Sequence, residues 1–213
     1  MVHNYAVEVF CLLRDPERTR RSAEATVNLA SELANPFRRA IGEFYLGWCD
    51  SLEQDVAEAI TRMQRALADF RATGSLTVTS FLLSLIAQAQ CSSGRFKEAL
   101  AAIDEALAAI EQTGERAFEA EVHRAGGEVY LATDSLKVER AEHSFRTAID
   151  IARRQNAKSW ELRATMSLAR LMRDTNRRDE ARVMLTDIYN WFTEGFDTAD
   201  LKDAKALLDE LKN

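Results

Sequence analysis

Residue types that often ligate metals or act as catalytic bases are scarce and widely spaced in this sequence. It contains three cysteines and three histidines, at Cys11, Cys49, Cys91, His3, His123 and His143. Zinc sites and disulfide frameworks use clustered cysteines such as CxxC pairs, and the sequence has none. His123 follows Glu119 by four residues, so the two share a helix face, but one such pair lacks the further ligands of a metal site. We therefore expect buried, reduced thiols, no metal, no cofactor and no enzyme activity.

The charge balance and the distribution of apolar residues argue against several further classes. The 213 residues carry a formal net charge of −6, which repels the phosphate backbone of nucleic acids. Arginine pairs such as Arg153-Arg154 lie among acidic residues, so we interpret them as solvated helix faces. The most apolar run, Phe81 to Ala89, is about half as long as a membrane span. The N-terminus lacks the pattern of a signal peptide, and we expect a cytoplasmic protein that binds neither nucleic acid nor membrane.

Residues that interrupt helices recur at nearly regular intervals of 19 to 22 residues along the chain. These positions are Asp15-Pro16, Asn35-Pro36, Gln54-Asp55, Gly74, Gly94, Gly114, Asp134-Ser135, Asn156, Asn176 and Gly195. Aspartate or asparagine before proline is typical of a helix start, and glycine is typical of a helix end. Between these positions apolar residues recur at helical spacing. The sequence therefore predicts helices of about 15–18 residues joined by short turns.

A second period, near 40 residues, relates alternate helices to one another. Small residues late in each first helix are followed twelve residues later by alanine and then by a bulky residue, as in Gly47–Ala59–Met63 and Gly127–Ala141–Phe145. Small residues let two helices approach closely, so Gly126-Gly127 indicates a close helix crossing rather than a phosphate-binding loop. This pattern is that of tetratricopeptide repeats (TPRs), with longer helices.

The pattern predicts an all-α, right-handed α-solenoid of about five TPR-like helix pairs plus a C-terminal capping helix. We expect one domain over residues 1–213, with repeats at about 2–34, 36–74, 75–114, 115–156 and 157–195 and the cap at 197–212. Asp197 and Asp200 predict a capping box at the start of that last helix. The degenerate first pair predicts an exposed apolar edge, with Val7, Val9, Phe10 and Leu13, through which the chain could form a homo-oligomer.

The C-terminal third resembles a known type of bacterial signalling protein. Residues 152–164 (ARRQNAKSWELRA), 167–171 (SLARL) and 191–202 (WFTEGFDTADLK) carry the resemblance. They are similar to the TPR-like C-terminal region of proteins that join an adenylate/guanylate cyclase or winged-helix domain to an ATPase module, a layout shared with maltose-regulator-type activators. This chain has no GxxxxGK[ST] phosphate loop. The resemblance therefore implies only the sensory or interaction module.

In TPR-like proteins the first helix of each pair lines a concave groove. The corresponding candidate binding residues here are Phe44, Trp48, Phe81, Gln88, Arg124, Glu128, Arg163, Arg170 and Arg173. The groove should grade from apolar near Trp48 to charged near the arginines, which can bind carboxylates or phosphate. Two alternatives stay open at this point. Phe44 and Trp48 could pack beneath a neighbouring helix, and Glu121 with Arg163 and Glu128 with Arg170 could form a structural ladder.

Two functions follow from these features. The first is a protein- or peptide-binding scaffold that serves as the interaction or regulatory module of a bacterial signalling system. The alternative is a small-molecule sensor that relays ligand binding to an attached or partner ATPase or cyclase. Ligand retained through purification or a ligand-dependent rise in melting temperature would favour the sensor.

Overall fold

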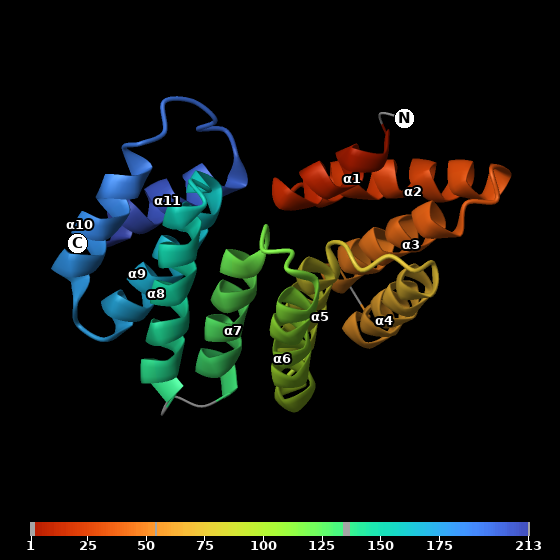
Figure 1. The fold of residues 1–213 in the computed structure, drawn as a ribbon. Helices are drawn as coiled ribbons and strands as arrows, with labels where there is room; N and C mark the ends of the chain where they lie inside the picture. Colours follow the sequence, from red (N-terminus) through yellow and green to blue (C-terminus); the bar gives the residue numbers. More distant parts are fainter. Residues whose placement is uncertain (1–2, 54, 134–136, 213) are drawn as a thin grey trace.

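The computed structural model describes residues 3–53, 55–133 and 137–212, and all regular structure in these ranges is helical (Figure 1). The helices are α1 (His3–Leu12), α2 (Pro16–Glu32), α3 (Pro36–Ser51), α4 (Val56–Ala72), α5 (Thr79–Ser92), α6 (Phe96–Thr113), α7 (Glu119–Thr133), α8 (Val138–Arg154), α9 (Lys158–Asp174), α10 (Arg178–Tyr189) and α11 (Ala199–Glu210). The predicted all-α solenoid is confirmed. No helix in the described ranges is long and apolar enough to cross a membrane.

The helix ends follow the chemistry expected from the sequence. Asp15 and Asn35 accept hydrogen bonds from the first-turn amides of α2 and α3, at 2.9 and 3.0 Å, and a proline follows each of them. Gly94 and Gly114 adopt left-handed φ angles of 77° and 70°, which glycine tolerates without a steric penalty. Three predicted breaker residues, Gln54, Asp134 and Ser135, lie outside the described residues.

The last helix begins differently from the prediction. The residue before α11 is Thr198, and its hydroxyl donates a 2.7 Å hydrogen bond to the carbonyl oxygen of Gly195 instead of capping the helix. The predicted capping box of Asp197 and Asp200 therefore does not form. Asp200 instead pairs with Arg163, 2.7 Å away on α9, because a guanidinium offers its carboxylate a stronger, charge-assisted bond.

Helices α1 to α10 pack as five consecutive pairs, and each pair also contacts the next. Close crossings occur where the sequence places glycine late in a first helix. A methyl group built on Gly127 would overlap the ring of Phe145, and one on Gly47 would lie 2.9 Å from Cγ of Met63. The expected close crossing at Gly127 is confirmed, and it lets α7 and α8 approach within the core.

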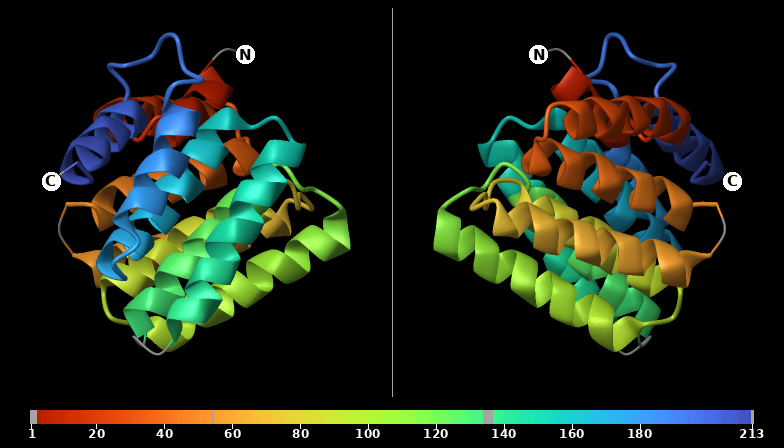
Figure 2. Two further views of the ribbon diagram at one scale, coloured as in Figure 1. Left: turned by 90° about the vertical axis from the view of Figure 1, so that its left-hand side faces the viewer. Right: turned by 90° about the vertical axis from the view of Figure 1, so that its right-hand side faces the viewer.

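The solenoid curves until its first and last helices lie on the same side of the molecule (Figures 1 and 2). Arg14, directly after α1, pairs with Asp200 and Asp203 of α11, at 3.2 and 2.6 Å. There are two large core clusters, one centred on α3–α5 and one on α8–α11. The rings of Phe81, Phe118 and Trp160 pack together, and Trp160 joins the first cluster to a small one formed by Ala120, Ile151 and Ala152. The curvature therefore turns the concave face inward and encloses a space between the two ends.

Candidate functional site

A cavity of about 470 Å³ occupies the concave face. It is bounded by the end of α1 and by α3, α5, α7, α9 and α11, so nearly all of its wall comes from the first helices of the pairs. The lining residues are Cys11, Arg14, Pro16, Trp48, Ser51, Leu52, Phe81, Leu85, Gln88, Ala89, Ser92, Glu121, Arg124, Arg163, Met166, Ser167, Arg170, Asp200 and Asp203. Regular stacking of the helices places residues at equivalent repeat positions along one continuous surface.

One side of the cavity is apolar. Trp48 on α3 and Phe81 and Leu85 on α5 form this wall, and Phe81 is almost completely buried. The ring of Phe81 stacks on Phe118, with 4.6 Å between the centroids. The stacked rings of Phe81 and Phe118 make this wall rigid. An apolar side chain of a ligand can therefore pack on the wall at little cost in conformational entropy.

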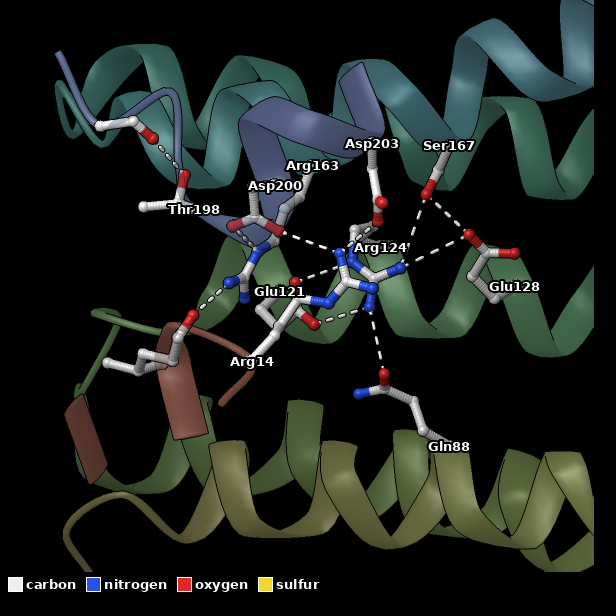
Figure 3. Close-up of polar contacts among 12 residues, drawn as sticks. Arg14, Gln88, Glu121, Arg124, Glu128, Arg163, Ser167, Thr198, Asp200 and Asp203 are labelled. Carbon is white, nitrogen blue, oxygen red and sulfur yellow. Dashed lines mark hydrogen bonds and ion pairs between the residues drawn. The ribbon is translucent and has the colours of Figure 1, made fainter. Parts of the chain in front are cut away.

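The polar part of the lining is built around Arg124, whose side chain is largely buried and whose contacts are drawn in Figure 3. Arg124 donates to both carboxylate oxygens of Glu121, at 2.6 and 2.8 Å, and to the amide oxygen of Gln88 at 3.2 Å. Glu128 lies 3.4 Å from Arg124 and accepts a 2.6 Å hydrogen bond from Ser167 on α9. Burial lowers the pKa of Arg124, but the hydrogen bonds and charge of Glu121, together with the charges of Glu128 and Asp200, outweigh burial and raise this pKa. The network ties α5, α7 and α9 together beneath the groove.

A second network closes one edge of the cavity where the chain ends meet (Figure 3). Arg163 pairs with Asp200 at 2.7 Å and donates a short hydrogen bond to the carbonyl oxygen of Leu12. Arg14 adds the two ion pairs to Asp200 and Asp203. We call Arg14, Arg163, Asp200 and Asp203 the clasp. Arg14 and Asp200 are 186 residues apart in the sequence. The local sequence pattern therefore did not predict Arg14, Asp200 or Asp203 as part of the site.

Arg170 differs from the other arginines of the cavity. It is exposed, lies on the α9 face that also presents Arg163, and forms no ion pair or hydrogen bond with another residue in the described part of the chain. Arg173, one turn further on, lies outside the cavity and pairs with Asp174 and Glu210 at 2.9 and 2.6 Å. Arg170 is therefore the groove cation with its charge most available to a ligand.

The structure brings six of the nine predicted binding residues to the cavity: Trp48, Phe81, Gln88, Arg124, Arg163 and Arg170. Phe44 does not reach it, because the side chain is buried in the core against Tyr45. Glu128 and Arg173 lie beside the cavity without lining it. The alternative prediction of a ladder was wrong in its pairing. Arg124 forms an ion pair with Glu121 on its own helix. Residues three positions apart on a helix are neighbours, so this pair forms within one repeat.

Burial shifts the pKa values of the cysteines and of His123. Burial raises the pKa of Cys11 well above its usual value and that of Cys49 to about 12, so both stay protonated thiols. Burial lowers the pKa of His123, and Glu119 only partly opposes this. Among the described residues no group of three His, Cys, Asp or Glu side chains is arranged to hold a metal ion.

No family model matches the sequence, and no curated protein matches it closely. Among solved structures, PlcR of Bacillus thuringiensis in complex with the peptide PapR7 and DNA has a TM-score of 0.77 at 14% identity, covering 99% of this chain and 73% of PlcR. A Rap protein complexed with Competence and Sporulation Factor has a TM-score of 0.65 at 14% identity, over 99% of this chain and 62% of Rap.

A third similar structure is a signal transduction ATPase with a tetratricopeptide repeat sensor from Pyrococcus horikoshii. Its TM-score is 0.64 at 13% identity, and the match covers 99% of this chain but only 32% of that protein. Identities this low establish the fold alone. The chain is a TPR-like α-solenoid.

Proposed function

We propose that this chain is a non-catalytic protein- or peptide-binding module that regulates a bacterial signalling system in the cytoplasm. The observation that carries the proposal is the concave cavity, whose lining combines the apolar wall at Trp48 and Phe81 with Arg170, a cation that has no ion-pair partner among the described residues. The fold supports it, since the PlcR and Rap structures of the same fold hold the peptide PapR7 and Competence and Sporulation Factor. The net charge of −6 disfavours nucleic acid as the ligand.

The chemistry of the cavity specifies the ligand in part. An apolar side chain of the ligand packs on the half-buried Trp48, which the buried Phe81 backs, and a carboxylate binds the guanidinium of Arg170. Arg124 and Arg163 are committed to Glu121 and Asp200, so a ligand gains less from them than from Arg170. The three predicted arginines that line the cavity therefore divide into one that recognises ligand and two that shape the cavity.

Selection of peptides from a displayed random library against the full chain tests this proposal. The selected peptides should contain an apolar residue near a carboxylate, and Trp48→Ala or Arg170→Ala should each weaken binding by about tenfold or more. Arg178→Ala is the matched control, because Arg178 is exposed on α10 and away from the cavity. Peptides that bind both cavity variants as tightly as the wild type would show that the groove is not the binding site.

A small-molecule sensor that relays binding to an ATPase or cyclase is the second candidate. The cavity volume of about 470 Å³ favours it, because pockets for small ligands span about 300–1,000 Å³. The cavity is also closed on one side by the clasp. Native mass spectrometry of the purified chain would reveal a retained metabolite, and the same compound should then raise the melting temperature of the wild type but not of Arg170→Ala.

A further inference from the structure

A second cavity, of about 420 Å³, lies at the seam between the two ends of the chain. It is bounded by α1, by α9, and by α11 together with the segment that precedes it. Its lining is mainly apolar and consists of Val9, Leu12, Leu13, Ser159, Trp160, Leu162, Arg163, Phe192, Glu194, Gly195, Thr198, Asp200 and Leu201. We call it the seam cavity.

Large apolar side chains around the seam cavity remain open to solvent. Val9 and Leu13 line it, and Trp191 and Phe196 belong to the adjoining segment; these four are between 43% and 57% exposed. The predicted apolar edge of the first pair is thus only partly right, since Val7 is fully buried and Val9 and Leu13 face the seam. Clustered exposure of this kind is typical of interaction surfaces.

The charges around the seam cavity define what kind of partner fits it. Glu194 lines the cavity and Asp197 lies three residues on, and both are exposed, with no ion pair to another residue in the described ranges. Lys158, whose ammonium lies over the ring of Trp191, adds no free positive charge here, because it pairs with Glu161 at 2.7 Å. The carboxylates of Glu194 and Asp197 are therefore available to a cationic partner, in a chain whose net charge is −6.

We propose that the seam cavity docks a basic amphipathic helix of a partner protein. Apolar side chains on one face of that helix enter the cavity between Val9, Leu13 and Phe192, while lysines or arginines at its edges pair with Glu194 and Asp197. This surface does not depend on the concave groove as a binding site, because the residues that give it its apolar and acidic character, Val9, Leu13, Phe192 and Glu194, do not line the groove.

The two cavities nevertheless share a wall. Arg163 and Asp200 line both of them, and their ion pair separates the groove from the seam. A helix docked in the seam cavity therefore rests against the same pair that borders the groove. This arrangement gives a partner protein direct physical contact with the boundary of the ligand site.

The test uses two fluorescently labelled 18-residue peptides and the full chain. One peptide has leucines on one helical face and lysines on the other, and its counterpart has glutamates in place of the lysines. The wild type should bind the leucine–lysine peptide in preference to the leucine–glutamate peptide. Val9→Ser with Leu13→Ser should weaken that binding by about tenfold or more, because the double variant removes apolar area that the peptide contacts. Both side chains are exposed, so we expect the variant to fold.

Charge variants separate specific docking from general attraction to an acidic protein. Glu194→Lys with Asp197→Lys should reverse the preference toward the leucine–glutamate peptide. Asp104→Lys with Asp150→Lys changes the net charge equally at exposed positions of α6 and α8 and should leave the preference intact. Trp48→Ala, in the concave groove, should also leave it intact, so loss of groove binding and loss of seam binding are distinguishable.

Three outcomes would overturn the proposal. The first is no measurable binding of the leucine–lysine peptide, and the second is equal binding by the wild type and the Val9→Ser/Leu13→Ser variant. The third is a dimer in light scattering that this variant converts to a monomer, which would make a second copy of the chain the occupant of the seam cavity.

Discussion

The ion pair between Glu121 and Arg124 offers the sharpest test of how the groove is held together. We consider three variants, Glu121→Met, Arg124→Met and the double replacement. Methionine has a similar length to both side chains and adapts to irregular spaces, so the variants change charge more than volume. The pair is largely buried, and only 5% of the Glu121 side chain is exposed.

Each single replacement leaves a buried charge without its main partner, which costs about 3–5 kcal/mol. The loss of stability for Arg124→Met should lie at the upper end of this range, because Glu121 then has no remaining cation in contact among the described residues. The loss for Glu121→Met should lie at the lower end, because Arg124 keeps its hydrogen bond to Gln88 at 3.2 Å and its ion pair with Glu128 at 3.4 Å. The double replacement removes both charges and should cost about 1 kcal/mol or less.

Urea unfolding followed by far-ultraviolet circular dichroism measures these free energies, and an unchanged m-value shows that the transitions are comparable. The control is Asp179 with Arg182, another i,i+3 pair on a helix, in which both side chains are well exposed. Its variants should shift stability by about 0.5 kcal/mol or less. If the double variant at Glu121 and Arg124 lost as much stability as the two single variants combined, the charges would not compensate one another and the reasoning would fail.

Two further changes probe the packing and the surface charges. Gly127→Val should destabilise the chain by about 3 kcal/mol or more, because the new side chain overlaps the ring of Phe145, and adding Phe145→Leu should recover part of the loss in the same urea assay. Hydrogen bonds from Arg177 and Arg146 hold the pKa of Glu142 down to about 2, against 4.5 for a free side chain. The stability this gives is present above about pH 4.5 and disappears as the pH falls toward 2, so Glu142→Gln should lower the melting temperature at pH 7 but not near pH 2.

The helices and their pairing were predictable from sequence because local chemistry encodes them. Asp15 and Asn35 cap helices through their own side chains, and Gly127 meets Phe145 on the partner helix of the same pair. These interactions span at most one repeat, so a periodic pattern reveals them. Six of the candidate residues chosen by the same periodicity, Trp48 among them, line one cavity on the concave face.

The pairing of charges was less predictable, because several partners compete for each arginine. The repeat geometry made Glu121 a candidate partner of Arg163. In the structure Glu121 instead forms an ion pair with Arg124 on its own helix, and Arg163 forms one with Asp200. Asp200 in turn was expected to help cap α11. Sequence spacing gives the set of groups within reach, whereas the choice among them depends on burial and distance after the solenoid has curved.

Closure of the solenoid depends on a property that no single repeat contains. Each stacking step adds a small rotation, and only their sum brings Arg14 to within 2.6 Å of Asp203. The clasp that results has two unequal parts. Arg163 and Asp200 are only 12% and 14% exposed, whereas Arg14 and Asp203 are 46% and 41% exposed. A solvated ion pair contributes about 0–1 kcal/mol, so the two contacts of Arg14 add little to closure. The buried Arg163 is the residue that reaches both ends, because it pairs with Asp200 of α11 and donates a hydrogen bond to the carbonyl oxygen of Leu12 in α1.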